Sequence, residues 1–436
     1  MKKDLFIKRA VSVASLLALS TFLLCADRIV SGGNHMDAQG DAGDVTSEAV
    51  TSEAPGKFSG GEVHEYMHPN DGYYCLLEDG VEYELREQQA GTCWICASTC
   101  AMITAYRLKH EGTIEAFDDL DLVDEIFDED ENGGVSGGDE HYGGVAVFVV
   151  NELSRGFLDG YVLDGYIQVQ DWSLEEIKEG IQKYGALYIG IPDSRKRFIR
   201  PKDGYLNLNF PNPEPEDYDH SIAIVGWDDH FPKEYFAVEA SRDGAWIAYN
   251  SNTPGKYYYV SYDTPFDRVN DLPAFMSVTD EYTKVLTHDG GRWTEDTAGE
   301  GETVTANVFK EEGKLAAVGT YITRDDSDLT VRIMTPDLKE VLYSAVFHAP
   351  YAGYCVIPLD TPMEVTEYAI AVTYPDGAPV EGESFEESPF RIKVSGNEGE
   401  SFILVGDEWL DLCMETTWDR IGFVTNNACI RALYVK

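Results

Sequence analysis

The chain has 436 residues, of which 43% are hydrophobic and 25% charged, and 78 acidic against 33 basic side chains give a formal net charge of −45. This length and hydrophobic content allow two or three domains with large cores and exclude a disordered or fibrous chain. The strong acidic excess argues against nucleic acid or an anionic membrane as the main partner. Eight cysteines are too few for a disulfide scaffold.

The N-terminal segment has the pattern of a secretory signal. Four basic residues within the first nine precede an apolar run over 10–26. We predict a signal peptide or an N-terminal anchor over 1–26, no further transmembrane segment, and an extracellular location, either secreted or associated with the cell surface. Residues 27–61 are rich in small and acidic residues and carry the tandem repeat VTSEAVTSEA, which predicts a low-complexity acidic linker.

The segment YELREQQAGTCWICASTCAMITAYRLKH, over 83–110, carries the first candidate for chemistry. From Trp94 onward its apolar and small residues predict a helix, with Gly91 and Thr92 at its start. Cys93 therefore lies at a helix N-terminus, where the helix dipole favours a thiolate. Because the thiolate is the nucleophilic form of cysteine, this position suits covalent catalysis.

A cysteine nucleophile needs a base, and the chain offers a candidate in DYDHSIAIVGWDD. His220 precedes the apolar run 221–227, which predicts a buried strand with the histidine at its head. Asn250 ends a second strand-like segment, GAWIAYN. Its amide could hold one imidazole nitrogen and leave the other facing Cys93.

The motifs QAGTCW, DHSIAIVGWD and GAWIAYNS, in this order, resemble those of the papain-like cysteine peptidases. Two further segments agree: SGGDEHYGGVAVFVVNEL resembles the Gly-Gly turn before a helix in that family, and WSLEEIKEGIQKYGALYIGI its helix followed by a strand. The resemblance covers 62–279 and implies a two-lobed α+β fold. It also implies hydrolysis of a protein or peptide substrate, with no cofactor required. Cys93 would be the nucleophile, His220 the base and Asn250 the residue that orients the base.

The oxyanion donor departs from the pattern of the family. The family has Gln six positions before the cysteine, whereas this chain has Glu87 there. A one-residue deletion would align Gln88, which we choose over Gln89. The Cys93 backbone N–H would be the second donor.

The residues after Asn250 also depart from the family, which has Ser-Trp-Gly at this point. Asn252 stands in place of the tryptophan that covers the His–Asn pair, and Tyr257 or Tyr258 could cover it instead. The alternative function is therefore a weakened or inactive papain-like surface protein that acts as an adhesion or binding module.

Two neighbouring cysteines raise a redox alternative. Cys96 and Cys100 lie on the predicted helix, where we expect either core or disulfide-bonded side chains. Cys93-Trp-Ile-Cys96 also has the C-x-x-C spacing of redox proteins. A thioredoxin-like βαβ context is absent from the surrounding sequence, which argues against that function.

An acidic run within the same region resembles the start of a calcium-binding loop. Asp128, Asp130, Asn132 and Asp139 supply oxygen ligands near the spacing of such loops. They are the residues of a weak hypothesis of structural calcium. A solvated acidic loop is the alternative that we favour, because Asp139 stands where these loops place the longer Glu.

From residue 280 onward, short alternating runs separated by turn signals predict an antiparallel β-sandwich over 280–436. The order of these strands resembles the lectin-like domain that follows papain-type peptidases on bacterial surfaces, including clostridial ones. Cell-wall or surface-layer components are candidate partners, although carbohydrate binding does not follow from the resemblance. A disulfide between Cys413 and Cys429 is left open. The predicted strands are TVTANVFKE, KLAAVGTYIT, LTVRIMT, GYCVIPLD, EYAIAVTYP, SFILVGDEW and ACIRALYVK.

Overall fold

The computed structural model describes residues 72–436, except for 82, 84–86, 111–113, 115–117, 128, 131–132, 137–142, 157, 193–206, 237, 253–256, 270, 291–292, 300 and 382–390. Helices and strands are both present, as the predicted α+β class requires. The predicted signal or anchor over 1–26 and the linker over 27–61 lie outside the described residues. Among those that are described, no helix is both long and apolar enough to span a bilayer.

The N-terminal domain, named after the predicted division at 279, is built on a buried central helix, α2. Every side chain of α2 from Trp94 to Ala105 is buried, so the helix is covered on all sides rather than on the one apolar face expected. Its serine and threonine hydroxyls donate to carbonyls of the same helix; for example, Ser98 donates to the Trp94 carbonyl four residues earlier. The helices of the described residues are α2 (Cys93–Lys109), α3 (Asp119–Ile126), α4 (Ala146–Arg155), α5 (Leu174–Tyr184) and α6 (Glu415–Ile421), with 3₁₀ turns at Pro215–Asp217 and Lys233–Tyr235.

A mostly antiparallel sheet packs against α2, and its strands follow the order β4-β10-β5-β7-β8-β9-β6, with β1 beside β7. Alternate residues of β7 face two cores: Ala223 and Val225 join the core around α2, whereas Ile222 and Ile224 join the core under α5. Burial on both faces explains the continuous apolar run in the sequence. The strands are β1 (Tyr73–Cys75), β4 (Val162–Gln168), β5 (Leu187–Pro192), β6 (Asn207–Leu208), β7 (Tyr218–Asp228), β8 (Ala245–Tyr249), β9 (Tyr257–Ser261) and β10 (Ala274–Thr279).

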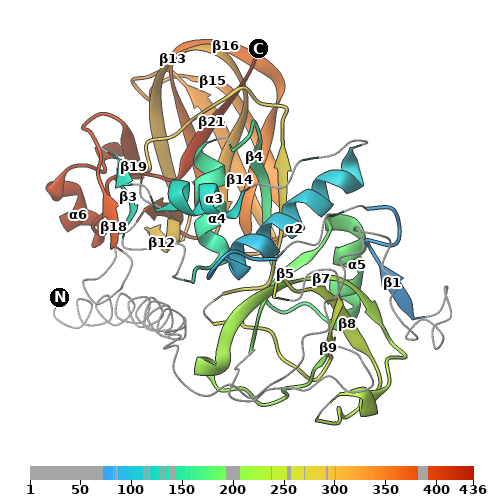
Figure 1. Ribbon diagram of the computed structural model, residues 1–436. Coiled ribbons are helices and arrows are strands. Elements are labelled where there is room, and N and C mark those ends of the chain that lie inside the picture. Colours follow the sequence, from blue (N-terminus) through green and yellow to red (C-terminus); the bar gives the residue numbers. More distant parts are fainter. Residues whose placement is uncertain are drawn as a thin grey trace.

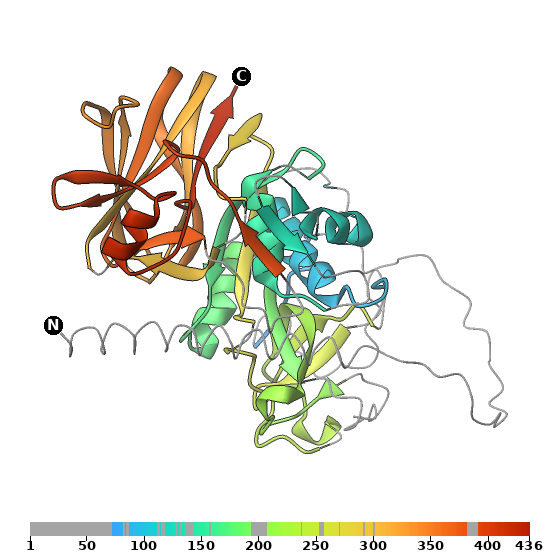
Figure 2. The same cartoon turned by 90° about the vertical axis from the view of Figure 1, so that its left-hand side faces the viewer.

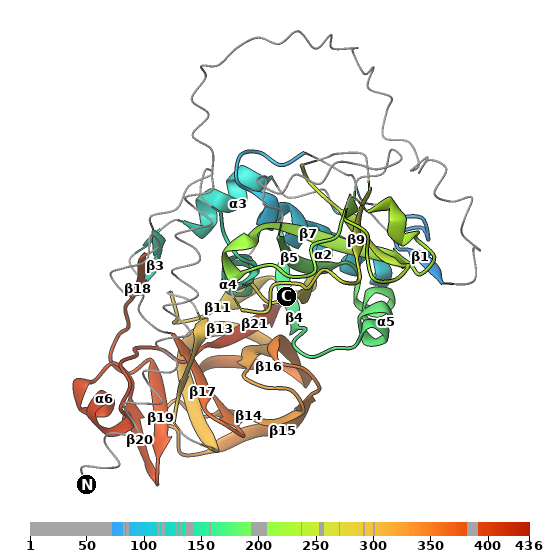
Figure 3. The same cartoon turned by 90° about the horizontal axis from the view of Figure 1, so that it is seen from below.

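The C-terminal domain consists almost entirely of antiparallel strands wrapped around a second core, with α6 at its side (Figures 1 and 3). α6, a helix of only seven residues, was not predicted from the sequence. The strands are β11 (Lys284–Leu286), β12 (Trp293–Ala298), β13 (Thr303–Ile322), β14 (Ser327–Met334), β15 (Val341–Ala349), β16 (Gly353–Tyr374), β17 (Ala378–Glu381), β18 (Arg391–Val394), β19 (Ser401–Val405), β20 (Glu408–Asp411) and β21 (Ile430–Val435).

Two long strands, β13 and β16, differ from the prediction of separate short strands. Each continues through a region where their mutual register shifts, between Lys310 and Gly313 and again between Leu315 and Ala317. The first half of β13 pairs with β19, and its second half pairs with β21. A bulged strand bends, so one strand can serve two sets of neighbours. Sequence alternation alone does not separate such a bend from a turn.

The two domains share one hydrogen-bonded sheet. β4 of the N-terminal domain pairs with β10 on one side and with β16 of the C-terminal domain on the other. Tyr321, Tyr354 and Cys429 of the C-terminal domain also belong to the core around α2. In Figures 1 and 2 the C-terminal strands accordingly lie directly against the helices of the N-terminal domain.

The acidic run predicted as a calcium loop is partly described. β2 (Glu129–Asp130) and β3 (Gly133–Ser136) form a hairpin, and β3 also pairs with β18 of the C-terminal domain. Asp128, Asn132 and Asp139 lie outside the described residues, and for Asp130 only the strand is described. Within the part of the chain that the structure describes, no group of three or more His, Cys, Asp or Glu side chains is placed to hold a metal ion. Structural calcium in this run stays a prediction.

Candidate active site

The fold brings three distant residues of the sequence to one place. Cys93 is the first residue of α2, His220 lies near the start of β7, and Asn250 directly follows β8. β7 and β8 are antiparallel neighbours, so the start of one strand lies beside the end of the other. This pairing places Asn250 next to His220.

The His220 ring is held by Asn250. His220 Nε2 lies 3.0 Å from Asn250 Oδ1, and this oxygen also accepts the backbone N–H of Asn252 at 3.0 Å. A backbone N–H can only donate, which identifies the atom as the carbonyl oxygen of the Asn250 amide. His220 Nε2 must therefore carry the proton, and Nδ1 is left to face Cys93.

Cys93 is partly exposed at the head of α2, and its thiol hydrogen bonds to His220. Burial disfavours the thiolate, but the charge and the hydrogen bond of His220, together with the backbone N–H groups of Ser221 and Trp94, lower the pKa of Cys93 below its ordinary value. The arrangement favours a thiolate–imidazolium pair, the reactive state of a cysteine nucleophile.

Gln88 connects the segment before α2 to the segment after β8. Its Oε1 accepts the Ser251 hydroxyl at 2.7 Å, and its backbone N–H donates to the Ser251 carbonyl at 3.2 Å. Its Nε2 donates to the Ala90 carbonyl at 2.8 Å, which uses one of its two amide hydrogens. Gln89 is exposed, and its backbone carbonyl caps the turn before α2 by accepting from Thr92. Of the two glutamines, Gln88 therefore adjoins the His220–Asn250 pair.

Asn252 is a residue of the site that sequence reasoning missed. Its amide nitrogen lies 3.3 Å from His220 Nε2, so its side chain lies beside the His220–Asn250 pair. Tyr257, which we considered for this role, accepts a hydrogen bond from the Cys75 thiol. The only signal in the sequence was the position of Asn252 at the point where the family has tryptophan.

The candidate site opens into a cleft. Two of its walls depend on glycine: a Cβ on Gly144 would lie 2.5 Å from the Trp94 ring, and one on Gly190 would lie 2.9 Å from Asp267 Cβ. Both side chains would clash, so these walls consist of backbone. The lining residues are Cys93, Gly143, Gly144, Gly190, Tyr218, Asp219, His220, Ser221, Asp267 and Asp271.

A buried carboxyl group, Asp271, lies at the edge of this cleft and was not predicted. Asp271 Oδ1 accepts the Ala146 N–H at the start of α4 at 3.1 Å, and Oδ2 accepts the Tyr188 hydroxyl. Tyr188 also bonds to the Ser221 hydroxyl at 2.9 Å. Burial first, and the neighbouring Asp267 in addition, raise the pKa of Asp271 well above its ordinary value.

The remaining cysteines do not form a redox pair. Cys93 and Cys96 form no disulfide with each other, and Cys96 is buried with its thiol 2.9 Å from Asp119 Oδ2. Cys100 is a buried core residue, so the core alternative holds for both helix cysteines. Cys413 and Cys429 are free as well, and the disulfide between them that we left open is absent from the structure.

Comparison with known proteins agrees with this architecture. Residues 285–434 match the family model of the lectin-like domain. The whole structure resembles that of the clostridial cysteine protease Cwp84 after propeptide cleavage, with a TM-score of 0.68, 18% identity, and coverage of 84% of this chain and 99% of the other. The chain has the fold of a papain-like protease with a lectin-like domain.

A second structure extends the comparison. It contains the cysteine protease and lectin-like domains of Cwp84, a surface layer associated protein of Clostridium difficile, and gives a TM-score of 0.65 at 18% identity over 84% of this chain and 89% of the other. No curated protein sequence matches this chain. The papain-like fold and the lectin-like domain predicted from the motifs are thus confirmed.

Proposed function

We propose that this protein is a cysteine endopeptidase that is secreted or held at the cell surface. The observation that carries the proposal is the contact of the Cys93 thiol with His220, whose other ring nitrogen is held by Asn250. The resemblance to a surface layer associated protease supports the location. Cell-wall or surface-layer components are proposed partners of the lectin-like domain.

The proposed reaction uses an acyl-enzyme. The Cys93 thiolate attacks the carbonyl carbon of the scissile bond, and the Gln88 amide and the Cys93 backbone N–H stabilise the oxyanion that forms. His220 gives its proton to the leaving amine, and the C–N bond breaks to leave a thioester on Cys93. His220 then takes a proton from water, the hydroxide attacks the thioester, and the proton returns to sulfur as the acid product leaves.

The proposal is tested by alkylation and cleavage measured on the same sample. At about pH 6.5, where an ordinary thiol of pKa near 8.5 reacts slowly, iodoacetamide should label Cys93 first, and casein cleavage should fall in step with the label. Cys413 is a matched internal control, because it is also partly exposed but burial and Asp411 raise its pKa. Equal labelling of the two thiols together with no cleavage would reject a peptidase and favour the alternative of a binding module.

The charge of the cleft leads to a prediction about substrates. Asp219 and Asp267 line it, whereas His220 is its only basic lining residue among the described ones. We expect peptides with Lys or Arg near the scissile bond to be cleaved at least about tenfold faster, in kcat/KM, than matched peptides with Asp or Glu there. The measurement is a set of paired fluorogenic peptides at low and high salt. Asp267→Asn should reduce the difference in kcat/KM between basic and acidic peptides. An unchanged preference for basic peptides in this variant would refute the role of Asp267 in substrate selection.

A further inference from the structure

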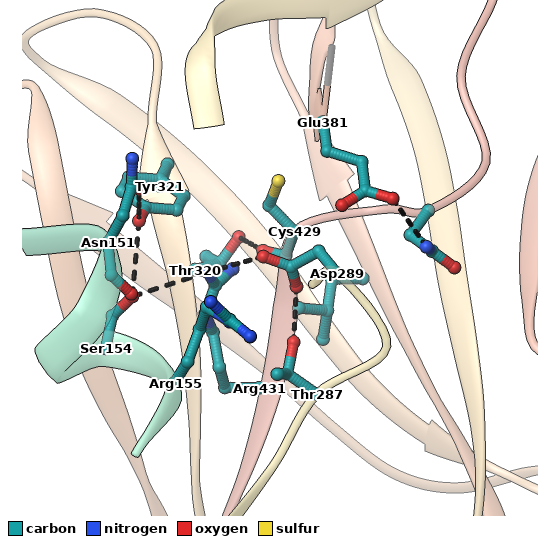
Figure 4. Close-up of polar contacts among 12 residues, drawn as sticks. Asn151, Ser154, Arg155, Thr287, Asp289, Thr320, Tyr321, Glu381, Cys429 and Arg431 are labelled. Carbon is teal, nitrogen blue, oxygen red and sulfur yellow. Dashed lines mark hydrogen bonds and ion pairs between the residues drawn. The ribbon is translucent and has the colours of Figure 1, made fainter. Parts of the chain in front are cut away.

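A buried polar cluster joins α4 to the lectin-like domain, far in the sequence from the proposed catalytic residues. Asn151 and Ser154 lie in the C-terminal half of α4, and Tyr321 and Arg431 come from β13 and β21 (Figure 4). All four side chains are at most 1% exposed. Buried polar groups of this kind fix one geometry, because each lost partner leaves a desolvated group unsatisfied.

Tyr321 and Arg431 bind α4 directly. The Tyr321 hydroxyl donates to Asn151 Oδ1 at 2.5 Å and lies 3.2 Å from Ser154 Oγ. Arg431 Nη2 donates to Ser154 Oγ at 3.3 Å and to Asp289 Oδ2 at 2.6 Å. The Arg431 guanidinium also lies over the Tyr321 ring, 4.9 Å from its centre. The lectin-like domain therefore holds the C-terminal half of α4 through charge-assisted and hydroxyl hydrogen bonds.

The other end of the same helix forms part of the cleft. The Ala146 N–H binds Asp271, and Gly143 and Gly144, just before α4, line the cleft. Gly144 abuts the ring of Trp94, the residue after Cys93. Ala146 and Ser154 are only about 12 Å apart along the helix, at 1.5 Å per residue. A helix of this length moves as a rigid body, so a displacement at Ser154 reaches the cleft wall.

We propose that the lectin-like domain positions the cleft wall of the peptidase through α4, with Tyr321 and Arg431 as the positioning residues. The domain is then a structural part of the active site and not only an appended binding module. The effect on substrate binding rests on the proposed peptidase function. The effect on α4 does not.

The experiment compares Tyr321→Phe with Tyr368→Phe in the full chain. Both tyrosines are buried in the lectin-like domain and both variants lose hydroxyl hydrogen bonds. The Tyr321 hydroxyl bonds to Asn151 and Ser154 of α4, whereas the Tyr368 hydroxyl bonds to Tyr434 within the lectin-like domain. We expect Tyr321→Phe to raise KM for peptides roughly tenfold with a smaller change in kcat, since a displacement of about 1 Å can cost a hundredfold. Backbone amides over 146–150 should exchange faster with deuterium in Tyr321→Phe than in Tyr368→Phe.

The outcomes separate the two proposals. If the two variants match in KM and in amide exchange over 146–150, the positioning role is overturned. If the wild-type chain cleaves no protein, the peptidase proposal fails, and amide exchange alone decides the role of Tyr321. Ser154→Ala removes, from the side of α4, the contacts of Ser154 with Tyr321 and Arg431. Backbone amides over 146–150 should also exchange faster in Ser154→Ala, even if Tyr321→Phe unfolds. An exchange rate equal to that of the wild-type chain in Ser154→Ala would overturn the proposal.

Discussion

Alanine in place of Cys93 or of His220 is expected to lower kcat for casein by on the order of 10⁵- to 10⁶-fold, and the double variant should be no slower than either single one. The two side chains form one hydrogen-bonded unit, in which His220 draws the proton from Cys93. Because the loss of either partner abolishes covalent catalysis, the loss of the second partner should not lower kcat further. The measurement is steady-state cleavage by the three variants under identical conditions.

The matched control for Cys93→Ala is Cys100→Ala. Cys100 is a thiol on the same helix, two turns further along, and it is fully buried in the core. Its loss should cost some stability but leave kcat within a few-fold. Single-variant losses that multiply in the double variant would mean that Cys93 and His220 act independently, contrary to the proposed mechanism.

The pH dependence of alkylation at Cys93 provides a second readout of the same pair. Because His220 lowers the pKa of Cys93, thiolate persists below pH 8.5, and alkylation should remain fast as the pH falls through this value. In His220→Ala, burial is left as the largest influence and raises the pKa, so the alkylation profile should move to higher pH. A profile that is the same in both proteins would show that His220 does not interact with the thiol.

Replacing Asp289 by alanine is expected to lower the free energy of unfolding by about 3–5 kcal/mol. Asp289 and Arg431 form an ion pair in which both side chains are 0% exposed. Burial disfavours the guanidinium charge, but the carboxylate of Asp289 raises the pKa of Arg431, so the side chain stays charged. Without Asp289 a desolvated cation is left, and within the described part of the chain Arg431 Nε and Nη1 already have no hydrogen-bond partner. Denaturant unfolding of the full chain measures the loss.

Two further variants test whether the loss of stability arises from the burial of the ion pair or from the loss of any ion pair. Arg420→Met breaks the exposed pair with Glu408, whose side chains are 43% and 65% exposed, and should cost at most about 1 kcal/mol. The double variant Asp289→Leu, Arg431→Met removes both buried charges and should recover most of the loss seen in Asp289→Ala. A double variant as unstable as the single one would show that the shape of this site, rather than the unpaired charge, determines the stability.

The parts of this protein that rest on local patterns could be predicted from its amino-acid sequence. The helix that starts at Cys93, the strand headed by His220 and the strand that ends before Asn250 were all predicted at these positions, because a helix start and a buried apolar run are visible within about ten residues. The helix followed by a strand over 172–191 was expected from the resemblance to the papain-like family, and the structure adds a capping box at its start.

The tertiary structure alone decided the contacts between segments far apart in the chain. Asn252 lies beside His220 because β7 and β8 pair, and Asp271 reaches α4 across 125 residues of sequence. The long bent strands that serve two sets of neighbours, the sheet shared through β4 and β16, and the anchoring of α4 by Arg431 have no local signature. Such contacts depend on which surfaces meet after folding. The hydrophobic periodicity of one segment does not identify the segment with which it pairs.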